Sequence, residues 1–406
     1  MTNNGMSRRN FVKLSGIVAA GLGLAGCGGS NQSSGSSGGS SVGSGAGAIK
    51  IGGIGPVTGA TAIYGNATKF GAQVAVDLIN KEAGSTVFEL NWQDDEGDAE
   101  KAVNAYNTLM DWGMQVLVGT TTTTPCVAVA SKTSTDRVFE LTPSASSTDV
   151  TAGKDNVFQM CFTDPNQGEK SAEYISKKNL GKKVAVIYNN SDAYSTGIYN
   201  GFSKVASGLG LEIVSTQTFT DDSAQDFSVQ LNDAKSKGAD LVFLPIYYTP
   251  ASLILQQAKN MGFAPKFVGC DGMDGILTVQ GFDTSLAECL VLLTPFVASA
   301  SDENTVNFVK AYKELTGTGE DPNQFAADAY DCVYAIYAAV KAQNISASTP
   351  TADMCNTLLK TFGSGTFTYS SLTGKDMTWS SNGEVSKDPK GVVIKNGKYE
   401  SLDAEA

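Results

Sequence analysis

The sequence predicts an α/β protein of two similar lobes, each a doubly wound parallel sheet with helices on both faces. From Ile49 onward, short apolar runs of strand length alternate with longer stretches of helical periodicity, which is typical of βαβ units. The same order of segments returns after residue 166. Because 41% of the 406 residues are hydrophobic and only 17% are charged, the chain can bury two large cores.

The first pass along the chain alternates strands with helices. Each strand is a short run rich in apolar residues, and each helix carries apolar residues three and four positions apart, as Ala102, Ala105 and Tyr106 do in one of them. The predicted elements are strand 49–54, helix 67–81, strand 86–93, helix 98–112, strand 115–118, helix 126–134 and strand 138–141.

A second pass repeats this order. Its elements are helix 168–178, strand 184–188, helix 195–208, strand 212–218, helix 224–236, strand 241–244, helix 250–261 and strand 266–268. Tyr64-Gly65 follows the first strand as Tyr194-Ser195 follows strand 184–188, and Asp94-Asp95 has a counterpart in Asp221-Asp222. The internal repeat predicts two lobes of the same design.

Beyond Cys289 the pattern changes. Strand 290–294 is followed by helices 303–316 and 324–342, and from Gly365 the turns at Thr373-Gly374, Asn382-Gly383 and Asn396-Gly397 predict β-hairpins. We expect two lobes of two segments each, namely 49–164 with 297–345 for the first lobe and 165–296 with 346–406 for the second.

The N-terminus is predicted to be an export signal. Arg8, Arg9 and Lys13 precede an apolar run, 14–25, that is too short to span a bilayer. Arg8-Arg9 resembles a twin-arginine signal, and Leu24-Ala25-Gly26-Cys27 resembles the lipobox of bacterial lipoproteins. This resemblance implies a signal peptide at 1–26, a lipidated Cys27, and a flexible Gly/Ser-rich tether at 27–48 that holds the protein at the outer face of the bacterial cell membrane.

Charge and composition exclude several classes of function. The net charge is −12 and the Lys and Arg residues are scattered, so we expect no nucleic-acid partner. The chain has no histidine, which excludes Ser–His and Cys–His nucleophile pairs and histidine zinc sites. Carboxylate- or lysine-based catalysis stays open on this evidence, but the missing histidine disfavours an enzyme, and we expect no enzyme, no cofactor and no metal. Six further cysteines follow Cys27, and the sequence leaves open whether they pair or are buried thiols.

The segment 115–130 predicts an anion-binding turn. A buried strand ends before Gly119, five threonines follow, and Pro125 suits the first position of a helix because its missing N–H would be unpaired there anyway. We predict Thr124 as the N-cap, with Thr123 directly before it. Hydroxyl groups and backbone N–H groups at a helix N-terminus attract a negatively charged group.

Ligands of doubly wound sheets bind beyond the C-terminal ends of the strands. In the first lobe these ends carry hydroxyl groups and a helix N-terminus, and in the second lobe they carry aromatic rings and a carboxylate. Facing each other, the two sets would hold a small molecule with one negative and one positive end, which describes an amino acid. The residues are Tyr64, Thr122–Thr124 and Pro143–Ser146 in the first lobe, and Tyr194, Tyr247, Tyr248 and Cys270–Asp274 in the second.

Two other motifs are interpreted differently. Gly53-x-Gly55 with Gly59 is similar to a dinucleotide-binding loop, but the spacing is wrong and Pro56 lies inside the turn. Asp94-Asp95-Glu96 with Asp98 could bind a metal. Because the acidic pair recurs at the same point of the second pass, charge at a helix N-terminus is the favoured interpretation.

Several motifs together resemble the periplasmic binding proteins of the leucine/isoleucine/valine type, from about Ile49 to Leu402. They are Lys50–Gly52, Pro56–Gly59, Tyr64-Gly65, Ala75–Asn80, Asp94-Asp95, Val118-Gly119, Thr142–Ser146, Phe162–Gly168 and Phe267–Gly272. The resemblance implies lobes joined by three crossovers, near 163–166, 294–298 and 343–348. It also implies an extracytoplasmic solute-binding protein that carries an amino acid, branched-chain or otherwise apolar, to the permease of an ABC importer.

The resemblance also assigns roles to residues. Thr123 stands where the family usually has serine, so its hydroxyl and the neighbouring N–H groups would hold the ligand carboxylate with the backbone of Ser144. Ser146 matches a threonine that bonds both ends of the amino acid, and Asp271 stands where a glutamate takes the ammonium group. Tyr64, Tyr194 and one of Tyr247 and Tyr248 would form the walls, and Thr122 and Ala145 complete the predicted site.

Two other classes of protein are alternatives to a solute-binding protein, namely a sensor domain and a secreted enzyme. An extracellular sensor domain of this fold usually continues into a transmembrane helix, which we do not expect after Ala406. A secreted enzyme is disfavoured because histidine and a nucleophile elbow are missing.

Overall fold

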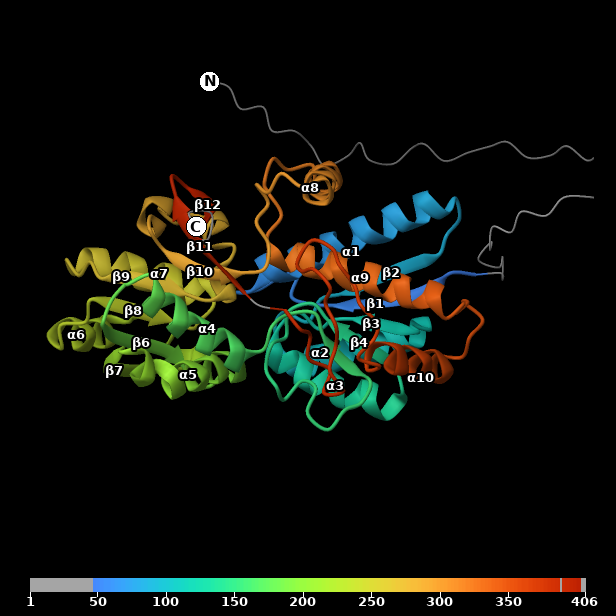
Figure 1. The fold of residues 1–406 in the computed structure, drawn as a ribbon, viewed down its shortest axis with the longest axis horizontal. Coiled ribbons are helices and arrows are strands. Elements are labelled where there is room, and N and C mark those ends of the chain that lie inside the picture. The colour runs from blue at the N-terminus through green and yellow to red at the C-terminus, as the bar shows by residue number, and fades with distance from the viewer. Residues whose placement is uncertain (1–46, 388, 403–406) are drawn as a thin grey trace, which may run out of the picture. The chain divides into compact units, whose positions relative to one another are not determined.

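The computed structural model describes residues 47–387 and 389–402, which form one parallel and one mostly parallel sheet with helices on both faces (Figure 1). The predicted signal peptide, Cys27 and nearly all of the tether lie outside the described residues. Within the described part of the chain, no helix is both long and apolar enough to cross a membrane.

The first sheet has the strand order β2-β1-β3-β4-β5, and every pairing in it is parallel. One face packs on α1, α9 and α10, and the other packs on α2 and α3. The strands are β1 (Ile49–Ile54), β2 (Phe88–Gln93), β3 (Val116–Val118), β4 (Phe139–Thr142) and β5 (Val157–Gln159). The helices are α1 (Ala62–Ala83), α2 (Ala99–Trp112), α3 (Thr123–Asp136), α9 (Gln324–Ala342) and α10 (Thr351–Phe362).

The second sheet has the order β12-β11-β10-β9-β8-β6-β7, and β11 and β12 are its antiparallel strands. Its strands are β6 (Lys183–Asn189), β7 (Glu212–Phe219), β8 (Leu241–Leu244), β9 (Lys266–Gly269), β10 (Val291–Thr294), β11 (Lys390–Lys395) and β12 (Lys398–Ser401). α4 (Asp164–Lys177) and α5 (Ala193–Ala206) cover one face, and α6 (Ser228–Ser236) and α7 (Tyr248–Asn260) cover the other. α8 (Glu303–Thr316) packs on α1.

The predicted fold class and the internal repeat are both confirmed. β2-β1-β3-β4-β5 in one sheet corresponds strand by strand to β7-β6-β8-β9-β10 in the other. In each sheet the chain order reverses beside the first strand, between β1 and β3 and between β6 and β8. This is the switch point where doubly wound sheets bind ligands.

The packing of residues 346–406 differs from the prediction that this whole segment belongs to the second lobe. α10, which the sequence reading missed, buries Met354, Leu358 and Phe362 against the first sheet, and Trp379 packs in the same core. The indole N–H of Trp379 donates to the carbonyl of Gln159 in β5, 2.8 Å away. The part of 346–406 that joins the second sheet is thus β11 and β12. The third crossover consequently lies between Val385 and Lys390 and not near 343–348.

The predicted late hairpins form only in part. β11 and β12 make a hairpin with Asn396-Gly397 at its turn, whereas residues 369–385 contribute only the isolated bridges Tyr369–Met377 and Trp379–Val385. The six described cysteines are unpaired, and five of them are buried while Cys289 is exposed. The sequence had left this point open.

A buried ion pair lies beside the third crossover. Lys387 Nζ lies 2.7 Å from Asp328 Oδ1 of α9 and donates to Thr373 Oγ1 at 2.8 Å. The two charged side chains are 2% and 3% exposed. Asp331, one turn further along α9, accepts hydrogen bonds from the N–H and hydroxyl of Thr373. These contacts attach the last segment of the first lobe to α9.

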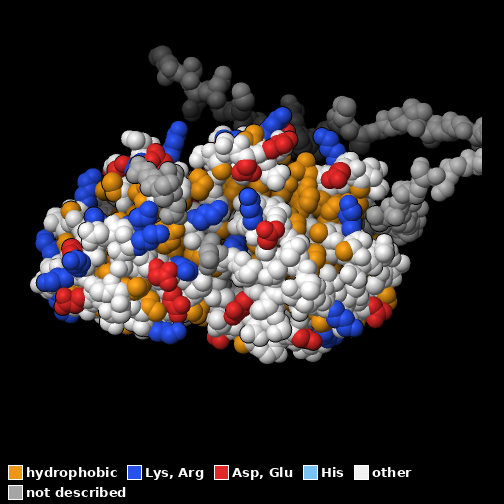
Figure 2. All heavy atoms as spheres, viewed as in Figure 1, with side chains coloured by type: hydrophobic (Ala, Val, Ile, Leu, Met, Phe, Trp, Pro, Cys, Tyr) orange, Lys and Arg blue, Asp and Glu red, His pale blue; other side chains and the backbone are white. Residues whose placement is uncertain are grey.

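Hydrophobic side chains also reach the surface beside α8, over α1 and α9 (Figure 2). Tyr330, Tyr334 and Tyr337 of α9 are partly buried against the first-lobe core, and the Tyr330 and Tyr334 ring centroids are 4.6 Å apart. These rings cover the outer side of the first-lobe core.

Candidate functional site

The turn between β3 and α3 begins one wall of the site. Gly119 has φ +148°, and a Cβ there would lie 2.8 Å from the carbonyl oxygen of Ile54, so the chain can take this path only with glycine. α3 begins at Thr123 with Thr122 as its N-cap, so the prediction of Thr124 as the N-cap was wrong. Pro125 occupies the third helical position, which tolerates it because first-turn N–H groups have no partner within the helix.

A small cavity of about 10 Å³ lies where the strand ends of the two lobes meet. Ten residues line it, and seven of them are among the predicted site residues: Tyr64, Thr122, Thr123, Ser144, Tyr194, Tyr247 and Asp271. Of the other three, Gly272 lies in the predicted strand-end segment Cys270–Asp274, whereas the sequence reading missed Thr121 and Phe325. The predicted residues Ala145, Ser146 and Tyr248 do not line this cavity.

Hydroxyl groups dominate the first-lobe wall. Ser144 Oγ donates to the carbonyl of Thr121 at 2.6 Å, and the N–H of Ser146 donates to Thr123 Oγ1 at 3.3 Å. These bonds join the loop after β4 to the start of α3. Thr122 Oγ1 is buried, and no group of the described residues forms a hydrogen bond with it. Buried polar atoms without a partner indicate a place where a ligand or water supplies one.

A buried carboxylate is the centre of the second-lobe wall. Asp271 is 3% exposed, and its Oδ1 accepts a hydrogen bond from the Tyr194 hydroxyl at 2.7 Å. Burial raises the pKa of Asp271 from 3.8 to about 6, while the bonds from Tyr194 and Gln167 oppose this rise. The Tyr194 ring stacks on Tyr247 at 4.7 Å with an interplanar angle of 5°. The second lobe thus offers an ionisable carboxyl group beside stacked aromatic rings.

Tyr64 joins the two lobes across the cavity. Its hydroxyl donates to the carbonyl of Gly272 and accepts from the N–H of Tyr248 at 3.3 Å. The Tyr248 hydroxyl in turn accepts from the N–H of Ile63 at 3.3 Å. The sequence left Tyr247 and Tyr248 as alternatives for the cavity wall. Tyr247 faces the cavity, whereas Tyr248 lies behind Tyr64.

Gln324, at the first position of α9, is a second link between the lobes. Its backbone N–H donates to Asp274 Oδ2 at 2.9 Å, and its Nε2 donates to the carbonyl of Asp271 at 3.3 Å. Phe325, the next residue, lies against Tyr64 with ring centroids 4.5 Å apart. Contacts between the two lobes therefore surround the cavity.

The acidic motif near Asp94 is structural. Asp94 accepts hydrogen bonds from the Thr58 hydroxyl and from the N–H groups of Val57 and Glu96, and Asp98 is the N-cap of α2. Among residues 47–387 and 389–402, no group of three or more His, Cys, Asp or Glu side chains is arranged to hold a metal ion.

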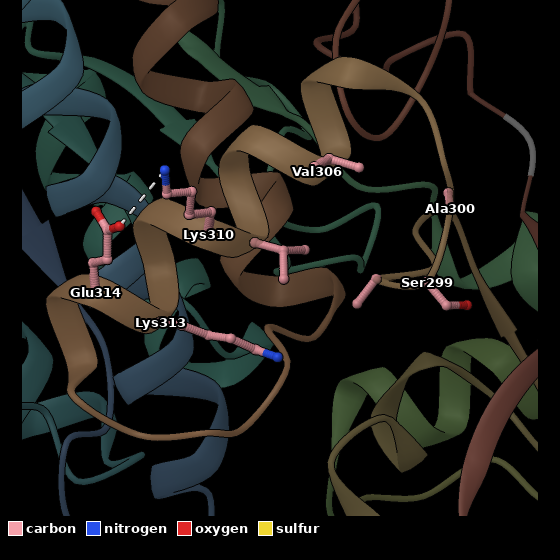
Figure 3. Close-up of a pocket in the computed structure, with 8 residues that line it drawn as sticks. Ser299, Ala300, Val306, Lys310, Lys313 and Glu314 are labelled. Atoms are coloured by element: carbon pink, nitrogen blue, oxygen red, sulfur yellow. Dashed lines mark ion pairs between the residues drawn. The ribbon is translucent and has the colours of Figure 1, made fainter.

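A shallow depression on α8 has different chemistry (Figure 3). Ala298, Ala300, Val306 and Val309 line it, and the Lys310–Glu314 ion pair at its rim is 75% and 69% exposed on its two sides. Solvent-exposed ion pairs and small apolar side chains provide no buried polar group for a ligand. The enclosed cavity at the strand ends is therefore the candidate site.

Comparison with known proteins agrees with this geometry. A Leu/Ile/Val-binding protein homologue of Brucella melitensis is 34% identical over 228 residues, which is 55% of this chain and 61% of that protein's length. The solved leucine-binding protein of Thermotoga maritima has a TM-score of 0.75 at 26% identity, covering 87% of this chain and 97% of that one.

A second solved structure was determined with a ligand. The branched-chain amino acid transporter substrate-binding protein of Streptococcus pneumoniae, in complex with isoleucine, has a TM-score of 0.77 at 28% identity and covers 87% of this chain and 98% of that one. These relatives are binding proteins and not enzymes, in agreement with the class predicted from the sequence. The family model described as periplasmic binding protein matches residues 48–397, and the chain therefore belongs to the periplasmic binding protein family.

Proposed function

We propose that this protein binds an aliphatic α-amino acid between its two lobes and delivers it to the membrane permease of an ABC importer. One observation carries the proposal most strongly, namely that the two cavity walls are complementary to a zwitterion. The first-lobe wall has the α3 N-terminus and the unpartnered Thr122 hydroxyl, and the second-lobe wall has the buried Asp271 carboxyl.

The carboxylate end of the ligand is assigned to the first lobe. The N-terminus of α3 carries a partial positive charge, and Thr122 and Thr123 place hydroxyl groups beside it. Ser144 lines the same wall, where its backbone can contribute. Ala145 and Ser146 lie behind it, and we assign to them the support of this loop in place of the direct ligand bonds expected from the sequence.

The ammonium end is assigned to Asp271, which Tyr194 and Gln167 orient. The Tyr194 hydroxyl donates to its carboxyl group, and the Gln167 Oε1 accepts from its backbone N–H at 2.6 Å. Tyr64, Tyr247 and Phe325 surround the remaining space with aromatic carbon, which suits an aliphatic side chain. The names of the relatives, which include proteins for leucine, isoleucine and valine, support this choice.

Isothermal titration calorimetry with leucine, isoleucine, valine, alanine, glutamate and lysine tests the ligand class. We expect the branched-chain amino acids to bind most tightly and glutamate and lysine to give no heat, because the aromatic walls leave their side-chain charges without partners. Tightest binding by a charged amino acid would contradict the proposed substrate class, and no binding by any amino acid would contradict the proposed function.

Binding of an aliphatic amino acid should weaken on acidification. With the pKa of Asp271 raised to about 6 by burial, the carboxyl group is mostly ionised at pH 7 and mostly protonated at pH 5. Because only the ionised form pairs with an ammonium group, we expect leucine affinity to fall about tenfold between pH 7 and pH 5. Calorimetry across this range measures the effect, and a flat profile would exclude Asp271 as the ammonium partner.

The effect of Asp271 on folding stability has the opposite pH dependence from its effect on ligand affinity. The folded-state pKa of Asp271 lies above its unfolded value of 3.8, so the folded protein binds more protons between these two values. The contribution of Asp271 to stability is therefore largest below pH 4 and is lost as pH rises through about 6. Thermal melts of the ligand-free protein at pH 5 and pH 7 supply this control.

Lipid anchoring through Cys27 is part of the proposal and depends on the sequence resemblance alone. The basic n-region, the short apolar run and the Leu24–Cys27 motif support a lipoprotein signal. We expect Cys27→Ser to move the protein from the membrane fraction to the medium or periplasm of the producing cells. Immunoblots of the fractions test this, and membrane retention of the variant would contradict the anchor.

A further inference from the structure

A second and larger cavity of about 780 Å³ lies beside the candidate site. α1 and the segment after β10 form one side, and α8 with the loop that precedes α9 forms another. The remaining sides come from residues 274–278 and from the β11–β12 hairpin. Of its lining residues only Asp274 belongs to the strand-end segments predicted from the sequence, and Asp274 does not line the smaller cavity.

The two cavities share a wall, because three segments place neighbouring residues in both. Ile63 lines the larger cavity and Tyr64 lines the smaller one. In the same way Asp274 and Asp271 line the two cavities, as do Asn323 and Phe325. Gln324 bonds both aspartates, through its N–H to the Asp274 carboxyl and through its side chain to the Asp271 carbonyl. A ligand that fixes one side of this wall therefore constrains the other.

Both lobes contribute to the larger cavity. Ile63 and Phe70 belong to α1 of the first lobe, whereas Asp274, Leu277 and Tyr399 belong to the second. Opening of the lobes would separate these two sets of residues. A molecule that contacts both sets in the closed form consequently favours closure, which is the state that the amino acid also favours.

The lining chemistry describes the occupant. Phe70, Leu277, Phe296, Val297 and Tyr312 present apolar surface. At the shared wall, the 5% exposed Asp274 carboxyl has its Oδ2 bonded to a backbone N–H, and Asn323 lies beside it.

Acidic groups outnumber basic ones around this cavity. Glu320, Asp321 and Glu400 also line it, against the single cation Lys398 among its lining residues. Two of the acidic groups are in ion pairs with lysines, Asp321 with Lys313 at 2.6 Å and Glu400 with Lys395 at 3.5 Å. Among the described residues, the other two acidic groups of the lining, Asp274 and Glu320, form no ion pair with a lysine. This excess of acidic over basic groups favours a positively charged ligand.

We propose that the larger cavity is a second ligand site, for a small amine with an apolar body, and that its occupancy strengthens amino-acid binding in the first site. The amine would lie against Asp274 and the apolar body against Phe70 and Phe296. Binding in the larger cavity stands on its own residues, and only the coupling rests on the proposed function.

Titration of the protein with n-hexylamine, followed by calorimetry, tests the second site. We expect n-hexylamine to bind at least tenfold more tightly than hexan-1-ol, and hexanoate to give no binding. Asp274→Asn should remove the preference for the amine, because asparagine keeps the bond to Gln324 and loses the charge. The exposed Asp77→Asn makes the same charge change outside the cavity and should keep the preference. Equal binding of amine and hexanoate, or a preference that survives Asp274→Asn, would overturn the proposal.

Two further variants separate the sites. Thr278→Trp places a bulky side chain in the lining of the larger cavity and should weaken n-hexylamine binding, whereas Asp271→Asn should leave it unchanged. With n-hexylamine saturating, we expect the Kd for leucine to fall by about fivefold or more, a typical size for coupling between two sites. A rise in that Kd, or loss of amine binding in Asp271→Asn, would show that the amine occupies the first site and would overturn the proposal. If no amino acid binds, the amine titration still reports on the second cavity directly.

Discussion

Replacing Asp271 by asparagine is expected to weaken leucine binding by about 10- to 150-fold, because charge-assisted hydrogen bonds contribute roughly 1.5–3 kcal/mol each. Asparagine keeps the size of the side chain and an oxygen that can accept from the Tyr194 hydroxyl. The variant therefore removes the charge with little disturbance of the second-lobe wall. Isothermal titration calorimetry at pH 7 measures the change.

Asp222→Asn is the matched control. Asp222 is an exposed carboxylate of the same lobe, in the turn after β7, so its neutralisation changes the net charge equally. We expect this control to keep the wild-type affinity. Wild-type affinity in Asp271→Asn as well would remove Asp271 from the ligand site, and equal weakening in both variants would indicate a general effect of charge.

Replacing Lys387 by methionine is expected to lower the free energy of unfolding by about 3–5 kcal/mol at pH 8, because it leaves the buried Asp328 carboxylate without its counter-ion. Methionine fills most of the volume of the lysine side chain, so lost packing contributes little. Burial raises the pKa of Asp328 from 3.8 to about 7, against the opposing effect of Lys387. Without Lys387 the pKa of Asp328 rises further, and because protonation relieves the unpaired charge, the loss should shrink as pH falls toward 7. Urea unfolding at pH 8 and pH 5 measures both effects.

Lys101→Met supplies the comparison for that prediction. Lys101 forms an ion pair with Glu96 at 2.6 Å, but its side chain is 50% exposed. Surface pairs of this kind contribute less than about 1 kcal/mol, so the variant should unfold nearly as the wild type does. If Lys387→Met were as stable as Lys101→Met, the buried pair would not stabilise the third crossover.

The fold could be predicted because its signals are local. Alternating strand and helix patterns are visible along the chain, and the repeat after residue 166 predicts the shared strand order. Four site residues each follow a predicted strand, namely Thr122, Ser144, Tyr194 and Asp271. Because ligands of doubly wound sheets bind beyond the C-terminal ends of the strands, this position predicts that the four residues lie at the ligand-binding edge. These residues come from four separate segments of sequence, yet no long-range information was needed to find them.

The rest depended on tertiary packing. Phe325 reaches the cavity from the start of α9, a helix that follows no strand of the doubly wound pattern, so no strand-end argument could identify it. α10 has a clear apolar face, but the sequence does not show which sheet that face covers. The N-cap of α3 was misplaced because proline is accepted throughout the first helical turn.

A crystal structure of the protein grown with L-leucine tests the central proposal most directly. We expect the leucine carboxylate within hydrogen-bond distance of Thr122 or Thr123 at the start of α3, and its ammonium group on Asp271. The leucine side chain should lie against Tyr64, Tyr247 and Phe325. Leucine bound outside this cavity, or bound with its ammonium group on the threonines and its carboxylate toward Asp271, would contradict the proposed site.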